Sequence, residues 1–134
     1  MHFLLDTNAV ITLLAQRSAS LTERILNCAE GEIGVSAIVI HELYFGAYKS
    51  QKVEFNLETI RLLLRDFPVI PFDTNDAREA GQIRAELKAR GLPIGPYDTL
   101  IAAQARGRKL TLVSNNTKEF IRVQGLALQD WTTT

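Results

Sequence analysis

Short apolar runs alternate with longer amphipathic stretches along the whole chain. Runs of a few aliphatic and β-branched residues, bounded by polar or turn residues, are typical of buried strands. They predict five strands, at residues 2–5, 33–35, 69–72, 110–113 and 126–128. The amphipathic stretches predict helices over 8–16, 20–30, 53–66 and 96–106, a long helix from 74 that stops at Gly91, another after Ser36 and a short one within 114–120.

Several residues mark where these helices begin and end. Ser20 and Glu23 have the spacing of a capping box, which predicts the start of the second helix. Pro68 cannot continue the helix before it, and Gly91 easily adopts the left-handed conformation of a helix end. The alternation of strands and helices therefore predicts an α/β domain with a mainly parallel central sheet.

No repeat, low-complexity tract or linker interrupts this pattern, so we expect a single domain spanning residues 1–134. In open α/β sheets, sites form outside the carboxyl ends of the strands. This rule selects Asp6, which follows the first predicted strand, and residues 114–116, which follow the fourth.

Composition narrows the class of protein. The 134 residues are 46% apolar and 22% charged, as in ordinary globular proteins. No apolar run approaches the ~20 residues of a membrane span, and the initial HFLLDTN does not resemble a secretion signal. Cys28 is the only cysteine, which excludes an internal disulfide and a zinc-finger cluster and favours the reducing cytoplasm.

The charges are unevenly distributed although 15 Lys and Arg balance 15 Asp and Glu. Between Arg84 and Arg122 eight bases face three acids, a balance of +5, and residues 23–79 offset it with −4. Two interpretations remain open: helix surfaces that simply vary, or a basic face that attracts the phosphates of a nucleic acid. The candidate bases for such contacts are Arg106, Arg108, Lys109 and Lys118.

Three acidic residues occupy positions that suit a site. Asp6 either caps the helix that follows it or binds a ligand. Asp98, in GPYDTLIAA, falls in the first turn of a helix, where it either complements the helix dipole or belongs to a site. Glu42 lies within the apolar segment IVIHELYFG, where a buried carboxylate without a partner is costly. Glu42 is therefore the hardest of the three to explain as merely structural.

Asn116 and Glu119 follow the fourth strand in the segment SNNTKEF. Their spacing allows a capping box, and it equally allows both side chains to join the acids. Together these residues form a set of hard oxygen ligands without cysteine, which suits Mg²⁺ or Mn²⁺ better than zinc. Carboxylates beside a basic face are what metal-assisted cleavage of a phosphodiester requires.

Other catalytic motifs find no support in the sequence. No Ser/His/Asp or Cys/His set is evident, and neither G-x-x-x-x-G-K nor G-x-G-x-x-G occurs. His2 and His41 both sit in apolar runs, so we expect them to be structural. A response-regulator receiver has a similar alternation of elements, but it needs two adjacent acids after the first strand, where Asp6 is alone, and Asp73 after the third strand stands alone too.

Four motifs carry a resemblance to a known family: LLDTN at 4–8, HELYFG at 41–46, GPYDTLIAA at 95–103 and SNNTKEF at 114–120. In this order and spacing, the chain resembles the PIN-domain ribonucleases, and among them the VapC toxins of type II toxin–antitoxin pairs. The likeness extends over essentially the whole chain, including GQIRAEL at 81–87 and the terminal DW at 130–131. It implies a three-layer α/β/α PIN domain.

The resemblance places the family's first three acids on Asp6, Glu42 and Asp98, which would hold Mg²⁺, or Mn²⁺ in its place. It implies that Thr7 orients Asp6 and that Asn8 braces the adjacent loop. Many PIN domains have Asp where Asn116 stands here. Either Asn116 acts through its amide, or Glu119 one turn further supplies the fourth carboxylate.

The family also implies a function and partners. We expect a metal-dependent endoribonuclease toxin that cleaves structured RNA and so inhibits translation. The relatives point to tRNA as the substrate, with initiator tRNA as one candidate. A homodimer is implied, as is a VapB-type antitoxin that inserts a peptide into the active-site groove and binds DNA with its own domain, in a larger hetero-oligomer. The alternative is a catalytically silent PIN-like module that binds RNA or protein without cutting it.

Overall fold

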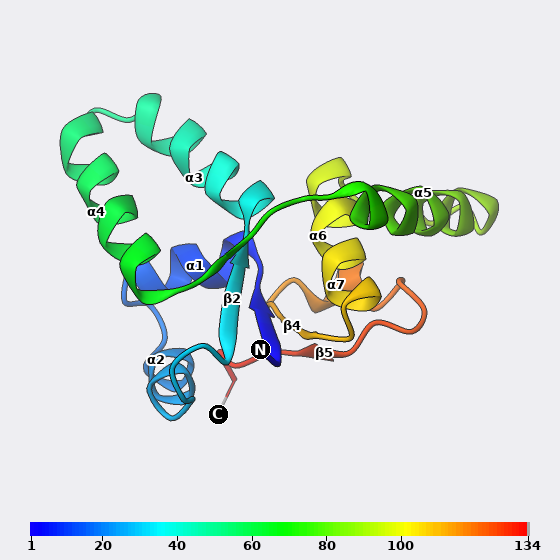
Figure 1. Cartoon of the computed structure of the whole chain (residues 1–134), viewed down its shortest axis with the longest axis horizontal. Coiled ribbons are helices and arrows are strands. Elements are labelled where there is room, and N and C mark those ends of the chain that lie inside the picture. Colours follow the sequence, from blue (N-terminus) through cyan, green and yellow to red (C-terminus); the bar gives the residue numbers. More distant parts are fainter. Residues whose placement is uncertain (134) are drawn as a thin grey trace.

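A computed structural model describes residues 1–133 and shows a central sheet flanked by helices (Figure 1). The strands are β1 (Phe3–Leu5), β2 (Ile33–Ser36), β3 (Val69–Ile70), β4 (Thr111–Val113) and β5 (Leu128–Gln129). The helices are α1 (Thr7–Leu14), α2 (Ala19–Leu26), α3 (Ala37–Tyr48), α4 (Val53–Asp66), α5 (Thr74–Ala89), α6 (Pro96–Gly107) and α7 (Thr117–Phe120). The predicted α/β class is confirmed. None of the helices within this part of the chain is long and apolar enough to cross a membrane.

All strand pairs are parallel, and the strand order is β3-β2-β1-β4-β5. β1 is the central strand, with Leu4 in register with Gly34 of β2 and Leu112 of β4. The chain builds outward from β1 first on one side and then on the other, so the order reverses between β1 and β4. Such a reversal leaves a crevice at the carboxyl ends of the two strands, which is where α/β proteins bind ligands.

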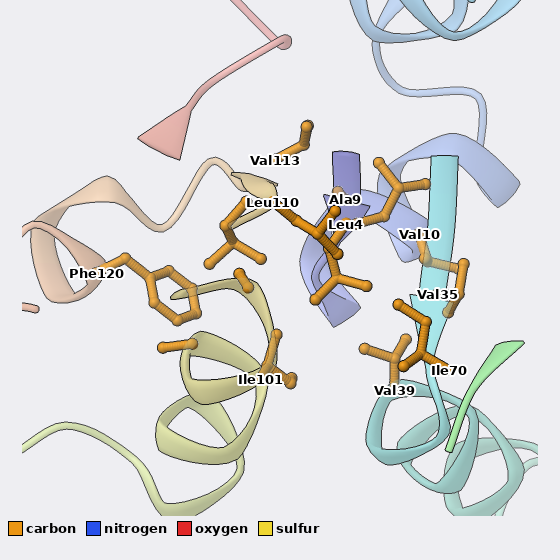
Figure 2. Close-up of a cluster of buried hydrophobic side chains, with 14 of the residues drawn as sticks. Leu4, Ala9, Val10, Val35, Val39, Ile70, Ile101, Leu110, Val113 and Phe120 are labelled. Atoms are coloured by element: carbon orange, nitrogen blue, oxygen red, sulfur yellow. The ribbon is translucent and has the colours of Figure 1, made fainter. Parts of the chain in front are cut away.

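The strands are apolar on both faces because helices cover both faces. Leu4, Leu5 and Leu112 have no exposed surface. Figure 2 shows Leu4 at the centre of the buried cluster, with Val35, Val39 and Ile70 on one side of it and Ile101 and Phe120 on the other. This core fixes the strand ends from which the site residues project.

Most helix boundaries follow the sequence signals. α4 ends two residues before Pro68. α5 ends at Ala89 and is followed by a left-handed Gly91, after which the N–H of Leu92 donates to the carbonyl of Leu87 as in a Schellman motif. In Figure 1, β2 runs directly into α3 at the same edge of the sheet where β1 leads into α1.

Several boundaries differ from the prediction, among them both ends of α2 and the position of the last strand. Ser18, not Ser20, caps α2, because its extended backbone lets its hydroxyl accept from the N–H of Leu21 at 3.1 Å. Ser20 instead bonds the carbonyl of Thr133, and the helix ends at Leu26 rather than near residue 30. The last strand lies at 128–129 instead of 126–128, because only these residues come into register with β4.

Candidate active site

Asp6 stands at the junction of β1 and α1, on the carboxyl edge of the sheet. It caps α1, because its Oδ1 accepts a hydrogen bond from the N–H of Ala9 at 2.8 Å. Its Oδ2 accepts a second bond, at 2.5 Å, from the hydroxyl of Ser114 at the end of β4. Only 2% of Asp6 is exposed. The two interpretations of Asp6, as a helix cap and as a site residue, are therefore compatible.

The surroundings of Asp6 favour its protonated form. The pKa of this carboxyl is raised from 3.8 to about 6, and burial is the largest cause. The bonds from Ser114 and Ala9 lower the pKa, whereas the charges of Glu42 and Asp130 raise it. A buried carboxyl with neutral donors and acidic neighbours would be stabilised in its charged form by a cation.

Glu42 reaches the same edge from the second turn of α3. Its side chain is half-buried, and its Oε1 accepts a hydrogen bond from the Thr7 hydroxyl at 2.7 Å. The expectation that Thr7 orients Asp6 is therefore wrong: because α1 packs against α3, the hydroxyl of Thr7 orients Glu42. This bond helps an otherwise apolar helix to tolerate a carboxylate.

Asp98 lies half-buried in the first turn of α6. Its pKa is raised from 3.8 to about 7, mainly by burial and also by hydrogen bonding to Glu119 and by the charges of Asp6, Glu119 and Glu42. Neighbouring charges act strongly on a pKa only at short range. The four predicted acids, which come from four distant parts of the sequence, are thus gathered at one edge of the sheet.

Asn116 connects two of these acids. Its amide donates to the carboxylate of Glu119 at 2.9 Å and, more weakly, to that of Asp98 at 3.5 Å. Its backbone N–H donates to the Ser114 hydroxyl at 2.8 Å. The capping-box interpretation of Asn116 and Glu119 is wrong, because the side chain of Asn116 makes no cap bond to α7. The two side chains face the acid cluster instead.

We define the acid cluster as Asp6, Glu42, Asp98, Asn116 and Glu119. Its donor set of carboxylates and one amide fits a hard divalent cation such as Mg²⁺ or Mn²⁺. Within residues 1–133, no three Asp, Glu, His or Cys side chains are already arranged to hold an ion. Binding would therefore need rotation of side chains toward one another, which a cation favours because it removes the repulsion between carboxylates.

Arg106 does not belong to this edge. It lies in the last turn of α6, about 12 Å along the helix from Asp98 at 1.5 Å per residue. Its Nε donates to Glu79 at 2.6 Å and its Nη1 to Glu86 at 3.1 Å, both on α5, and its side chain is only 13% exposed. The expected RNA-binding role of Arg106 does not fit this geometry; the residue joins α5 to α6.

Arg108 is engaged in the same way. It donates to both oxygens of Asp76, at 2.8 and 3.1 Å, and to the carbonyl of Pro71 at 3.3 Å. Asp76 is 4% exposed and also accepts from the amide of Gln104 at 3.1 Å. Two of the arginines in the basic segment, Arg106 and Arg108, are therefore paired with acids of α5 and with the segment before it, and are not free to bind phosphates.

The remaining predicted residues lie on the surface. Lys109 is exposed just after α6 in a left-handed conformation, and Lys118 is exposed on α7, next to Glu119. Of the four candidate bases, Lys118 alone is adjacent in sequence to a residue of the acid cluster, Glu119. Asn8 is exposed in the first turn of α1, and its bracing role stays a prediction.

Both histidines lie on the surface. The side chain of His2 is 71% exposed and lies 3.4 Å from Glu32. His41 is exposed because α3 buries its opposite side through residues such as Leu43. Its ring lies against that of Tyr97, with 5.3 Å between centroids.

Sequence reasoning missed two contributions. Ser114 was selected only by its place after a strand, and its bonds to Asp6 and to Asn116 depend on the pairing of β1 with β4. Tyr97 was not selected at all, although it immediately precedes Asp98. The sequence did offer a signal for each residue. Ser114 carries a hydroxyl at the end of a predicted strand, and Tyr97 is an aromatic residue next to the acid Asp98.

Comparison with known proteins agrees with this geometry. The family model for the PIN domain matches residues 3–126. The tRNA(fMet)-specific endonuclease VapC of Shigella flexneri is 44% identical over 131 residues, which cover 98% of each chain.

Solved structures show the same fold. The crystal structure of DNA-bound VapBC from Salmonella typhimurium matches with a TM-score of 0.92 at 39% identity over 98% of each chain. VapBC2 from Rickettsia felis, bound to a DNA fragment from its promoter, matches with a TM-score of 0.89 at 34% identity, over 98% of this chain and 99% of that one.

Proposed function

The chain belongs to the PIN-domain family, among the VapC ribonuclease toxins of VapBC toxin–antitoxin systems, and from this premise we propose that it is a metal-dependent endoribonuclease of transfer RNA. The observation that carries the proposal is the acid cluster. Four carboxyl groups and an amide from separate segments meet at the switch point of the sheet, and two of the carboxyls have strongly raised pKa values. We further propose that residues 1–134 act as one PIN domain.

Asp6, Glu42 and Asp98 would hold the cation, completed by Asn116 or Glu119. When bound, Mg²⁺ or Mn²⁺ lowers the pKa of the attacking water and offsets the charge of the phosphate. The protein groups position the carboxylates that would hold this cation.

Hydrogen bonds hold each of these carboxylates in place. The hydroxyl of Ser114 and the start of α1 fix Asp6, and the hydroxyl of Thr7 aims Glu42 toward it. The amide of Asn116 holds Glu119 near Asp98. These bonds limit the rearrangement of side chains that cation binding requires, and preorganised polar groups are a major source of catalytic power.

Transfer RNA is the proposed substrate because the S. flexneri relative is named a tRNA(fMet)-specific endonuclease and shares 44% identity over nearly the whole chain. The initiator tRNA is accordingly the first RNA to test. Its place of action would be the cytoplasm, where this RNA is found, and cleavage there would inhibit translation.

The test is cleavage of purified initiator tRNA by the full chain, with elongator methionine tRNA as the comparison. We expect cleavage of the initiator with Mg²⁺ or Mn²⁺ and none after EDTA. Asp6→Asn and Glu42→Gln should each lower the rate at least 100-fold. Asp66→Asn and Glu54→Gln, exposed acids on α4, are the matched controls and should cleave normally.

A folded wild-type protein that binds tRNA but leaves it intact with either ion would contradict the proposal. That outcome would favour a silent PIN-like binding module. Cleavage that persists in EDTA would instead remove the cation from the reaction.

We also propose that a cognate VapB-type antitoxin covers an apolar groove between α1, α2 and α4. The groove has a volume of about 370 Å³, and its lining includes Leu14, Leu26 and Leu62. Leu26 is 77% exposed and extends the apolar lining of the groove to the surface, and contiguous exposed apolar patches mark sites of protein–protein contact. The two solved relatives described above are VapBC complexes, which supports a protein partner for this chain.

In this proposal the toxin forms a homodimer, joins the antitoxin in a larger hetero-oligomer, and meets DNA only through the antitoxin. An antitoxin peptide would also enter the groove at the acid cluster. Co-expression with the antitoxin and light scattering give the stoichiometry. Leu26→Glu should weaken the complex, whereas Leu92→Glu, exposed far along the chain, should not.

A further inference from the structure

Two aromatic rings border the acid cluster. His41 of α3 and Tyr97 of α6 lie with their centroids 5.3 Å apart and their planes tilted by 59°. Each directly precedes one of the clustered carboxylates, Glu42 and Asp98 respectively. The contact between the two rings therefore spans the same two helices that bring these acids together.

The two rings have no evident structural task. His41 is exposed and Tyr97 is 45% exposed, so neither contributes a buried side chain to the core. Among the side-chain hydrogen bonds of residues 1–133, none uses the imidazole of His41 or the hydroxyl of Tyr97. Tyrosine normally buries its ring and leaves its hydroxyl in contact with a partner. An exposed ring beside a catalytic cluster is therefore available to a ligand.

RNA needs such a contact at this place. The acid cluster repels phosphates, and the arginines Arg106 and Arg108 are bonded to acids at the other end of α6. Sequence-specific proteins hold RNA largely by stacking its unpaired bases on aromatic side chains. Stacking also requires no charge, so it works next to carboxylates that disfavour the RNA backbone.

We propose that His41 and Tyr97 form a stacking platform that holds an unpaired base of the RNA beside the scissile phosphate. This inference rests on the proposed ribonuclease function and adds how the substrate is positioned. The tilt leaves the two rings as a corner, so that a base stacked on one ring meets the edge of the other. Both residues are positioning residues, and neither is assigned a proton transfer.

The test is binding of a short single-stranded RNA that carries one 2-aminopurine, whose fluorescence falls when it stacks. The Asp98→Asn protein is used with Mg²⁺, so that the RNA stays intact. We expect quenching on binding. Adding Tyr97→Ala should weaken binding about tenfold and abolish the quenching. His41→Ala should weaken it by a smaller factor, about threefold.

Conservative variants distinguish the effect of an aromatic face from the effect of side-chain size. Tyr97→Phe and His41→Phe keep an aromatic face and should preserve both signals, whereas Tyr97→Leu fills similar space without one and should behave like Tyr97→Ala. Tyr48→Ala, an exposed tyrosine at the far end of α3, is the matched control and should change nothing.

Steady-state cleavage by the otherwise wild-type chain distinguishes the two proposals. We expect Tyr97→Ala to raise KM for tRNA with little change in kcat. Wild-type cleavage together with unchanged binding and quenching in Tyr97→Ala would overturn the platform and leave the ribonuclease proposal intact. A fall in kcat at saturating RNA, with binding unchanged in His41→Ala, would also overturn it, because His41 would then act in the chemistry. Quenching by a wild-type protein that cuts no RNA would support the platform and overturn the ribonuclease.

Discussion

The acid cluster and the contact between α5 and α6 are built from the same kinds of residue but differ in their partners. In the contact, Asp76, Glu79 and Glu86 face Arg106 and Arg108 at distances of 2.6 to 3.1 Å. In the cluster, carboxylates face hydroxyls, an amide and one another.

The pKa values record this difference. Burial acts to raise the pKa of Asp76, but hydrogen bonds from Arg108, the backbone of Asp73 and Gln104 outweigh it and lower the pKa below its usual value. In the cluster, burial raises the pKa values of Asp6 and Asp98, and the surrounding acids raise them further. Paired acids stabilise the fold; acids gathered without a base form a place for a cation.

The largest effect that tests this difference is expected from neutralising an acid of the cluster. Asp98→Asn should lower the rate of RNA cleavage by at least 100-fold, because it removes a charged ligand while the first turn of α6 still accepts the side chain. The free energy of unfolding without cation should stay the same or rise, since repulsion between carboxylates falls. Single-turnover cleavage and urea denaturation measure the two effects. Near-normal cleavage at limiting Mg²⁺ would take Asp98 out of the ligand set.

Removing a base from the contact between α5 and α6 should lower stability and leave RNA cleavage unchanged. Arg106→Met leaves Glu79 and Glu86 without their partner, and we expect the free energy of unfolding to fall by about 2–3 kcal/mol. Cleavage by the folded fraction at low temperature should be unchanged. Arg61→Met breaks the fully exposed pair with Glu58 and should leave stability nearly unaltered. A change in RNA affinity without loss of stability would contradict this prediction and support an RNA-binding role for Arg106.

The pH should act on the two regions in opposite directions. Between about pH 4 and 7 the folded chain keeps protons on Asp6 and Asp98 that the unfolded chain has released. The cation-free protein should therefore lose stability from these groups as the pH rises through 6 and 7. Asp76, whose pKa is lowered, adds stability above the unfolded pKa and loses it as the pH falls.

The pH dependence of cation binding should depend on the same protons of Asp6 and Asp98. Because a divalent cation displaces protons from Asp6 and Asp98, the affinity for Mn²⁺ should be about tenfold higher at pH 8 than at pH 6. Calorimetric titration at the two pH values checks this difference. Asp98→Asn should reduce the pH dependence, and an equal dependence in both proteins would assign it to another group.

The smallest effect concerns the fourth position of the cluster. Asn116→Asp adds a carboxylate next to Asp98 and Glu119, so we expect Mn²⁺ to bind about three- to tenfold more tightly. Glu119→Gln should weaken binding by a similar factor. Titration of both variants, with Glu54→Gln as the exposed control, separates them. Unchanged affinity in both would leave a site made of three carboxylates.

Local pattern determined much of this protein. Apolar runs predicted five strands and placed the first four well but the last one too early, and their alternation with helices predicted the parallel sheet. The rule that sites lie at the carboxyl ends of strands selected Asp6 and the segment after β4. Errors fell where two local signals competed, as with Ser18 and Ser20, because either serine can cap a helix and it is Ser18 that has the extended backbone of a cap.

The roles of the charged side chains depended on the tertiary structure. In sequence, Arg106 and Lys118 belong to one basic segment, and Asp76 and Asp98 are both acids near helix starts. Folding places Arg106 against α5, leaves Lys118 in solvent, pairs Asp76 with Arg108 and leaves Asp98 among other acids. The physical reason is that a strand or helix forms from the preferences of neighbouring residues, whereas the energy of a charge depends on burial and on partners that are distant in the chain.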